Sequence, residues 1–299
     1  MSLSPYLCVN YRYVDAKEVA RLLPKRRPDS HKGENGVVLV VGGSEKYVGA
    51  PAFVALSALH SGCDLAIVAA PEKVAWVINT FSPDLITCKL PGSEFGINAM
   101  PIVMEEMKRA NAVVVGPGLG MSKKVSRGVI KLAEEINKAK VPALFDADGL
   151  KIVGPELERL GNQLWVLTPH AGEFQKISGE TLPPELDRRC EIVLEFAKES
   201  KCVILLKGRI DVIASPNGNV RLNKTGNPGM TVGGTGDVLS GIVGALLSQG
   251  LPSFEAAIAG AWICGRAGDL CAREKGYEFL SSDVIEKIPE VFKELRRCR

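Results

Sequence analysis

From residue 36 to residue 207 the chain alternates short apolar runs, rich in β-branched residues, with longer amphipathic stretches. The apolar runs lie at 36–43, 65–69, 112–116, 143–146, 164–168 and 203–207. A continuous short apolar run predicts a strand that is buried on both faces, as in a parallel sheet. Apolar residues recur at helical spacing in the stretches between these runs, for example at 51–61, 122–138 and 186–200. Repeated β-α-β units connect with right-handed crossovers, so the pattern predicts a doubly wound α/β sheet.

The pattern changes after residue 207. Two short alternating runs, at 211–215 and 219–222, flank the turn sequence Pro216-Asn217-Gly218. This arrangement predicts a β-hairpin at the edge of the sheet. Helical spacing of apolar residues then returns in three segments, at 236–248, 253–274 and 282–295.

The chain contains no linker rich in Pro or Ser and no visible internal repeat. Its 299 residues fall within the size range that a single α/β domain reaches. We therefore expect one domain over residues 31–299, preceded by an N-terminal extension over residues 1–30.

The charge balance argues against broad classes of partner. The chain has 37 basic and 34 acidic side chains, a formal net charge of +3, which is too small to favour nucleic acid or an anionic membrane. The N-terminal residues lack the basic and apolar regions of a signal peptide, and no run of about 18 apolar residues occurs. Eight cysteines without a C-x-x-C pair, with three histidines, argue against a zinc cluster and for reduced thiols. We expect a cytoplasmic protein.

The strongest local signal is the glycine-rich string at 225–237, which leads directly into an apolar helical segment. Glycines let backbone amides approach a ligand, and amides at a helix N-terminus carry partial positive charge, so such a loop suits a phosphate. The residues expected to line this anion hole are Gly233, Gly234, Thr235 and Gly236. Asp237 beside it makes chemical sense if its carboxylate accepts a proton from a hydroxyl that attacks a phosphoryl group. The alternative is a tight turn in which Asp237 only caps the helix.

Polar or glycine-rich segments also follow five of the predicted strands, at 42–44, 116–120, 146–149, 168–170 and 207–208. Ligands of an open parallel sheet bind beyond the carboxyl ends of its strands, so we expect these segments on one rim. Single members have structural alternatives: His170 as a hydrogen-bonded structural histidine, and Asp146 and Asp148 as helix caps. Neither G-x-G-x-x-G nor G-x-x-x-x-G-K-[ST] is present, so the common nucleotide fingerprints do not explain this rim.

Six strings occur in the order found in one enzyme family. They are Lys32-Gly33, Gly49-Ala50-Pro51, Gly116-Pro-Gly-Leu-Gly120, Leu167-Thr-Pro-His-Ala-Gly-Glu173, Leu206-Lys-Gly208 and Gly226-Asn-Pro-Gly-Met-Thr-Val-Gly-Gly-Thr-Gly-Asp-Val-Leu-Ser-Gly241. Over residues 31–295 the chain resembles the ADP/ATP-dependent NAD(P)H-hydrate dehydratases of the ribokinase-like superfamily. Several motifs in order are far more specific than any one of them. The resemblance implies a three-layer α/β/α fold with a mostly parallel central sheet.

Enzymes of this family repair NADH or NADPH whose nicotinamide ring has been hydrated. The resemblance implies the same lyase activity: the C6 hydroxyl of the S-epimer is phosphorylated from ADP or ATP, and elimination of phosphate restores the ring double bond. ADP, which gives AMP and phosphate, is the expected donor, because a stand-alone chain resembles the prokaryotic branch that uses ADP.

The resemblance also assigns residues and partners. Asp237 matches the catalytic residue. The positions implied for the hydrated cofactor are Ala50, Gly118, His170 and Asp237, and those for the nucleotide are Lys207, Gly208, Arg209, Ile210, Asp211 and Gly236. Magnesium that bridges the nucleotide phosphates is expected, without a named protein ligand. A homo-oligomer, by resemblance a tetramer, is implied as well.

Two positions depart from the family's pattern. Asp211 stands where a small hydroxyl residue is common after Lys-Gly-x-x, which weakens the case for its contact with nucleotide. Gly149 stands where Ala is usual, which is a mild change. Many relatives carry an upstream epimerase domain, and residues 1–30 are too few to encode one, so the dehydratase alone is expected.

Two other functions fit parts of the pattern. A ribokinase-like kinase for a vitamin-precursor alcohol, such as a thiazole or pyrimidine, would share the fold and Asp237 and release the phosphorylated alcohol. A nucleotide-sensing module would bind ADP without turnover and would tolerate Asp237→Asn. Segments 49–51 and 168–170 favour the hydrate pocket over the first alternative.

Overall fold

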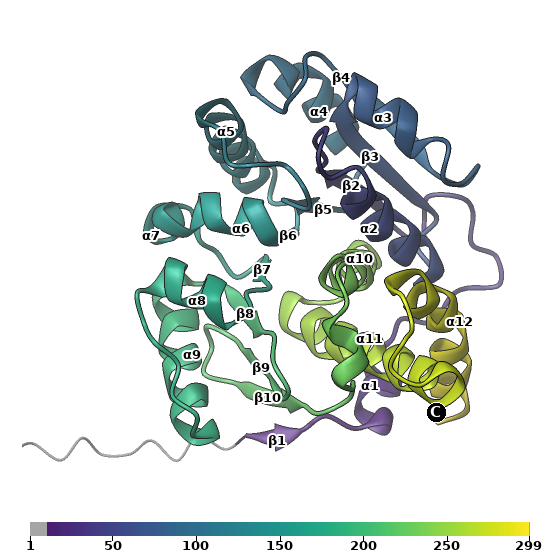
Figure 1. Ribbon diagram of the computed structural model, residues 1–299, viewed down its shortest axis with the longest axis vertical. Coiled ribbons are helices and arrows are strands. Elements are labelled where there is room, and N and C mark those ends of the chain that lie inside the picture. The colour runs from purple at the N-terminus through teal and green to yellow at the C-terminus, as the bar shows by residue number, and fades with distance from the viewer. Residues whose placement is uncertain (1–10, 299) are drawn as a thin grey trace, which may run out of the picture.

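The computed structural model describes residues 11–298, which form a ten-stranded sheet with helices on both faces (Figure 1). The strand order is β1-β10-β9-β8-β7-β6-β5-β2-β3-β4. The strands are β1 (Arg12–Tyr13), β2 (Val37–Val41), β3 (Leu65–Pro71), β4 (Ile86–Leu90), β5 (Ala112–Val115), β6 (Ala143–Phe145), β7 (Trp165–Leu167), β8 (Val203–Leu206), β9 (Asp211–Ala214) and β10 (Val220–Asn223). Strands β2 to β8 pair in parallel, and β9 is antiparallel to both of its neighbours. The predicted three-layer, mostly parallel α/β/α fold is confirmed.

All six predicted parallel strands are confirmed, as β2, β3, β5, β6, β7 and β8. The predicted hairpin is confirmed as β9 and β10, which pair Asp211 with Asn223 and Ala214 with Val220. The hairpin does not form the edge of the sheet as expected, because β1 pairs in parallel with the outer side of β10. The strand β4, which follows a loop at 79–85, was not among the predicted strands and forms the opposite edge.

The two helical layers follow from the alternation of side chains along the buried strands. In β2, Val38 and Val40 pack against one helical layer, and Val37, Leu39 and Val41 pack against the other. The first layer contains α1 (Ala16–Leu22), α2 (Gly49–His60), α3 (Glu72–Ile78), α10 (Thr235–Ser248), α11 (Ser253–Lys275) and α12 (Ser281–Arg297). The second contains α4 (Met100–Met107), α5 (Lys123–Ala139), α6 (Ala147–Val153), α7 (Leu157–Leu160), α8 (Ala171–Ser178) and α9 (Leu186–Ser200). Burial on both faces explains why these strands are continuously apolar.

The segment at 12–22 packs onto the body of the domain. Val14 N donates to Leu222 O at 2.9 Å, which extends the pairing of β1 with β10. Asp15 caps α1, and the buried Val19 and Ala20 place that helix against α11 and α12. Residues 12–22 of the segment expected to be an N-terminal extension therefore belong to the sheet and to the first helical layer. The first ten residues of the chain lie outside the described residues.

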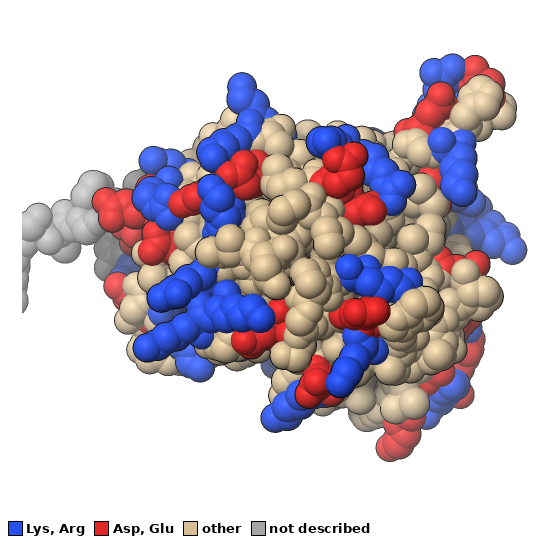
Figure 2. All heavy atoms as spheres, turned by 90° about the horizontal axis from the view of Figure 1, so that it is seen from above, with Lys and Arg blue, Asp and Glu red and all other residues tan. Residues whose placement is uncertain are grey.

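Three further properties of the described chain bear on the sequence analysis. Every described cysteine is free. From residue 11 to residue 298, no helix combines the length and apolar character needed to cross a bilayer. The face in Figure 2 carries Lys and Arg side chains close to Asp and Glu side chains, with uncharged surface between them.

Candidate active site

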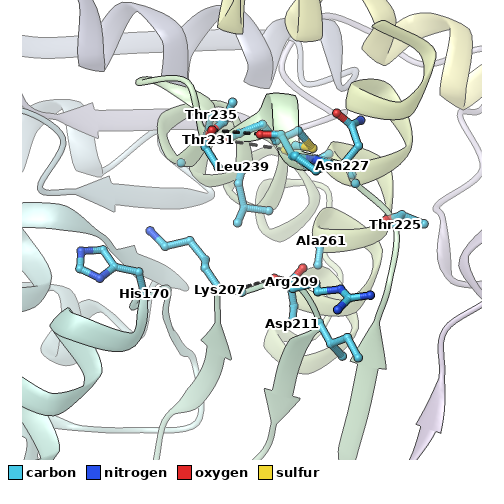
Figure 3. A pocket seen from close by; sticks show the side chains of 18 of the residues that line it. His170, Lys207, Arg209, Asp211, Thr225, Asn227, Thr231, Thr235, Leu239 and Ala261 are labelled. Atoms are coloured by element: carbon cyan, nitrogen blue, oxygen red, sulfur yellow. Dashed lines mark hydrogen bonds between the residues drawn. The ribbon is translucent and has the colours of Figure 1, made fainter. Parts of the chain in front are cut away.

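A cavity of about 1090 Å³ lies at the rim formed by the end of β8, the start of β9 and the N-terminus of α10 (Figure 3). The backbone of His170 forms a parallel bridge with Lys207, which brings the ends of β7 and β8 together. Of the residues predicted for the site, those that line the cavity are His170, Lys207, Gly208, Arg209, Ile210, Asp211, Gly233, Gly234, Thr235 and Gly236. The segment predicted to bind nucleotide, 207–211, and the predicted anion hole, 233–236, thus line the same cavity.

The glycine-rich loop enters α10 through a backbone conformation that requires glycine. Gly234 is the N-cap, with φ +100°, and a Cβ there would lie 2.9 Å from a ring carbon of Phe53. The hydroxyl of Thr235 donates to Met230 O at 2.8 Å and folds the loop back on itself. The first amides of an α-helix have no intrahelical partner, so the loop leaves amide donors at the cavity wall. An anionic phosphoryl group fits this wall.

Asp237 lies in the first turn of α10, half-buried, beside two other charged side chains. Burial raises the pKa of Asp237 to about 7, the negative charge of Asp146 adds to the rise, and the ammonium of Lys207 opposes it. A carboxyl group with a pKa near neutrality can accept a proton at physiological pH and release it again. Asp237 itself is not among the residues that line the cavity; its chain neighbour Gly236 is. A perturbed carboxyl group next to such a cavity is typical of a functional group.

Asp146 is the buried centre of a small polar network. Lys207 Nζ donates to its Oδ1 at 3.0 Å, and Ser240 Oγ donates to its Oδ2 at 2.8 Å. Burial alone would raise the pKa of Asp146, but Lys207 and these hydrogen bonds hold it below its usual value. Asp146 occupies the N-cap position of α6 without a side-chain cap hydrogen bond. The helix-cap alternative for Asp146 is therefore wrong, because its carboxylate is turned to Lys207 and Ser240.

The ammonium group of Lys207 places a positive charge at the cavity. Its Nζ lies 3.9 Å from Glu173 Oε2 in addition to its bond with Asp146. Burial would lower the pKa of Lys207, but the carboxylates of Asp146 and Glu173 raise it above its usual value, so the ammonium persists at neutral pH. A Cβ on Gly236 would lie 3.5 Å from Lys207 Nζ. The ammonium therefore sits directly beside the anion hole.

His170 has a structural role and also faces the cavity. Its Nδ1 accepts from Gly172 N at 3.1 Å and from Glu173 N at 3.3 Å, while Glu173 Oε2 accepts from His170 N at 3.1 Å. This reciprocal pair is a capping box at the start of α8. The imidazole side chain is 61% exposed, so the same ring remains accessible to a ligand.

Asp211 is engaged within its own turn. Its Oδ1 accepts from Gly208 N at 2.9 Å, and its Oδ2 accepts from Asn223 Nδ2 at 2.9 Å. Burial raises the pKa of Asp211 to about 6, although these hydrogen bonds and the charge of Lys207 act to lower it. The carboxyl group closes the turn from Lys207 to Asp211 and ties it to the end of β10.

Ala50 and Gly118 lie close to each other but do not line the cavity. A Cβ on Gly118, whose φ is +72°, would lie 3.4 Å from the Cβ of Ala50 and 2.8 Å from that of Tyr47. Nearby, Asp148 Oδ2 accepts from Gly120 N at 2.8 Å, so Asp148 ties the loop at 116–120 to the start of α6. These loops form a second part of the rim, beyond the ends of β2, β5 and β6.

The structure also reveals features that the sequence did not indicate. Tyr13, Lys224 and Leu239 line the cavity, and Ser240 reaches Asp146 from the helix that carries Asp237. A two-residue strand gives no periodic signal that would have identified Tyr13. Among residues 11–298, no three His, Cys, Asp or Glu side chains converge in a way that would hold a metal ion.

The family model, the relatives and the solved structures described below all point to the same enzyme family. The model of the family described as NAD(P)H-hydrate dehydratase matches residues 38–290. The bifunctional NAD(P)H-hydrate repair enzyme Nnr of Pyrobaculum aerophilum is 43% identical over 268 residues, which cover 90% of this chain and 52% of that protein. The chain therefore spans about half the length of this bifunctional relative.

A second relative matches end to end. The ADP-dependent (S)-NAD(P)H-hydrate dehydratase of Cenarchaeum symbiosum is 37% identical over 287 residues, covering 96% of this chain and 98% of that one. Among solved structures, the ADP/ATP-dependent NAD(P)H-hydrate dehydratase of Bacillus subtilis, co-crystallized with ATP/Mg2+, superposes with a TM-score of 0.79 at 27% identity, covering 96% of this chain and 99% of that chain.

Proposed function

The chain belongs to the NAD(P)H-hydrate dehydratase family, and on that premise we propose that it dehydrates the S-epimer of hydrated NADH or NADPH, using ADP or ATP. The observation that carries the proposal is Asp237, a carboxyl group with a pKa of about 7 at the amide-lined N-terminus of α10. A base beside an anion site is what transfer of a phosphoryl group to a hydroxyl requires.

The reaction has two steps. The C6 hydroxyl oxygen of the hydrated ring attacks the terminal phosphorus of the nucleotide, its proton passes to Asp237, and AMP leaves when ADP is the donor. The C6–O bond then breaks with its electron pair on phosphate, and a proton leaves the neighbouring ring carbon, which restores the double bond. Phosphorylation matters because phosphate is a far better leaving group than hydroxide.

The residues around Asp237 support the first step. The amides of the loop at 233–236 and the ammonium of Lys207 lie where negative charge develops on the transferred group. Asp146 and Ser240 fix the position of Lys207 and of the first turns of α10 relative to each other. Such preorganised groups need no rearrangement at the moment of transfer.

We assign the two ligands to the two parts of the rim. The nucleotide binds along Lys207, Gly208, Arg209, Ile210 and Asp211 and at Gly236, with Asp211 acting through the backbone of its turn. The hydrated cofactor binds between the loops that carry Ala50 and Gly118, with His170 and Asp237 at the junction of the two ligands. Exposure of the His170 ring supports this placement.

We propose that Mg²⁺ accompanies the nucleotide. In phosphoryl transfer Mg²⁺ is usually held by substrate phosphates and water together with one or two carboxylates. When bound, Mg²⁺ neutralises charge on the phosphates and orients them.

The wider setting is also a proposal. We propose a cytoplasmic homotetramer in which residues 31–299 form the dehydratase domain, to which the segment at 12–22 adds β1 and α1. Support for self-association comes from two large apolar side chains exposed near the β4 edge, Trp76 at 59% and Phe81 at 51%.

One experiment tests the proposed function. Purified protein is incubated with hydrated NADH, MgCl₂ and either ADP or ATP, and the absorbance of the reduced nicotinamide and the release of orthophosphate are followed together. The proposal predicts equal amounts of NADH and orthophosphate. Binding of ADP with neither product would favour the nucleotide-sensing alternative, and phosphorylation of a thiazole or pyrimidine alcohol without NADH formation would favour the kinase.

A further inference from the structure

We propose that the ring of Tyr13 stacks against the purine base of the nucleotide, so that the strand at the N-terminus completes the nucleotide site. The inference rests on the proposed function and extends it to a part of the chain that none of the motifs includes. It concerns a specificity-determining contact rather than the phosphoryl-transfer chemistry.

The topology places Tyr13 on the same rim as Lys207. β8 ends next to Lys207, and β9, which is antiparallel, begins at Asp211. β10 returns to this rim at Asn223, opposite Asp211, and β1 runs parallel to β10, with Tyr13 opposite Leu222. The end of β8, the start of β9 and the ends of β10 and β1 therefore lie at the same rim of the sheet. The order β8-β9-β10-β1 forms a continuous edge along the cavity.

The spacing along this edge matches a nucleotide. Tyr13 is three strands away from Lys207, and neighbouring strands are about 4.8 Å apart, which gives a separation of roughly 14 Å. This length is comparable to the extent of ADP from its terminal phosphate to its base. A phosphate bound beside Gly236 and Lys207 thus allows the base to reach β1, with the backbone of the turn at 207–211 under the middle of the ligand.

The surroundings of Tyr13 favour a stacked base. Tyr13 lines the same cavity as Lys207 and Gly236, and the residue is 43% exposed. The hydrogen bond from Val14 N to Leu222 O, at 2.9 Å, and the burial of the Val14 side chain hold β1 in place. Lys224 Nζ lies 5.2 Å from the centre of the Tyr13 ring, so a cation is available to the ribose or a phosphate. A positioned aromatic ring loses little conformational entropy when a base stacks on it.

Equilibrium binding of ADP to the full-length protein, measured by calorimetry, tests the inference. Tyr13→Ala is expected to weaken ADP binding on the order of tenfold, since a base–aromatic stack is lost. Tyr13→Phe keeps the ring and is expected to bind as the wild type does. Arg12→Ala is the matched control, because Arg12 lies on the same exposed strand and does not line the cavity. Wild-type affinity in Tyr13→Ala would overturn the inference.

A second measurement does not depend on affinity. With ring-labelled tyrosine, the NMR signal of Tyr13 among the five tyrosines is identified by its absence in Tyr13→Phe. ADP is expected to move this signal upfield by the ring current of the base, and inorganic pyrophosphate is expected to leave it unchanged. An unmoved signal at saturating ADP, or an equal shift with pyrophosphate, would overturn the stacking contact. Failure of the wild-type protein to bind ADP would instead overturn the proposed function, and the inference with it.

Discussion

Lys207 Nζ lies 3.0 Å from Asp146 Oδ1, so an ion pair joins the ends of β8 and β6 across the intervening strand β7. Ser240 extends this link to α10, the helix that carries Asp237. The pair thus fixes a positive charge beside the anion hole and a negative charge beside the proposed base.

The first prediction concerns Asp237 itself. Asp237→Asn removes the proton acceptor while keeping the shape of the side chain, so turnover of hydrated NADH is expected to fall more than about 100-fold. Binding of ADP, measured by calorimetry, is expected to persist. Turnover within a few-fold of the wild type would remove Asp237 from the mechanism.

The second prediction is a pH dependence. The pKa of Asp237 is raised to about 7 by burial and then by Asp146, and a base must be ionised, so kcat/KM is expected to rise with pH through about 7. Asp146→Asn removes the repelling charge and is expected to shift the rise to lower pH.

Ser240→Ala is the control for this profile, because it removes a hydrogen bond from Asp146 and keeps its charge. The kcat/KM of Ser240→Ala is expected to rise at nearly the same pH as that of the wild type. Matching profiles for Asp146→Asn and the wild type would show that the charge of Asp146 does not act on the titrating group.

The same pKa has a consequence for stability. A carboxyl group whose pKa is higher in the folded state than its usual value of about 3.9 binds protons more tightly when folded, so stability falls as pH rises from about 4 through 7. Asp237→Asn has no carboxyl group at this position, so it does not lose this stability as pH rises. Thermal unfolding is expected to show a higher Tm for Asp237→Asn than for the wild type at pH 8, with the gap narrowing toward pH 4. A gap that stays constant over that range would contradict the raised pKa.

The third prediction separates the two roles of His170. His170→Ala is expected to raise the KM for hydrated NADH more than the KM for ADP, and to lose about 1 kcal/mol of stability with the cap of α8. His170→Asn restores a capping side chain without the imidazole. It is expected to recover the stability and keep the raised KM; recovery of both would assign His170 to the fold alone.

The fourth prediction concerns the loop before α10. Gly234→Ala places a Cβ at φ +100° and 2.9 Å from the Phe53 ring, which is expected to cost about 1–3 kcal/mol and to weaken ADP binding. Gly233→Ala meets no atom within 4 Å and is expected to leave the Tm unchanged. Equal Tm values for the two variants would contradict the strain at Gly234.

Most of the sheet could be predicted because its strands are buried on both faces and therefore apolar throughout, as Val37–Val41 is. Strand β4, with Ile86 exposed and Lys89 partly buried, lacks that signature since it lies at an edge. Arg12–Tyr13 forms a strand only because β10, about two hundred residues later in the chain, supplies its partner. Such a long-range pairing leaves no local pattern.

Some features of the site could also be predicted from the sequence, and others could not. The rim could be predicted because parallel strands bring their carboxyl ends together, which places Lys207, His170 and the loop before Asp237 around one cavity. The direction of the Asp146 side chain could not be predicted, since it depends on Lys207 and Ser240, which reach it from other elements. The inward engagement of Asp211 with Asn223 depends on tertiary packing in the same way.

The central claim is that the C6 hydroxyl is phosphorylated before it leaves. Hydrated NADH labelled with ¹⁸O at that hydroxyl, incubated with the protein, MgCl₂ and ADP, tests it by mass spectrometry of the released orthophosphate. Because the bond that breaks is the one between C6 and the labelled oxygen, the label is expected in orthophosphate. Recovery of the label in water, with unlabelled orthophosphate, would contradict the mechanism.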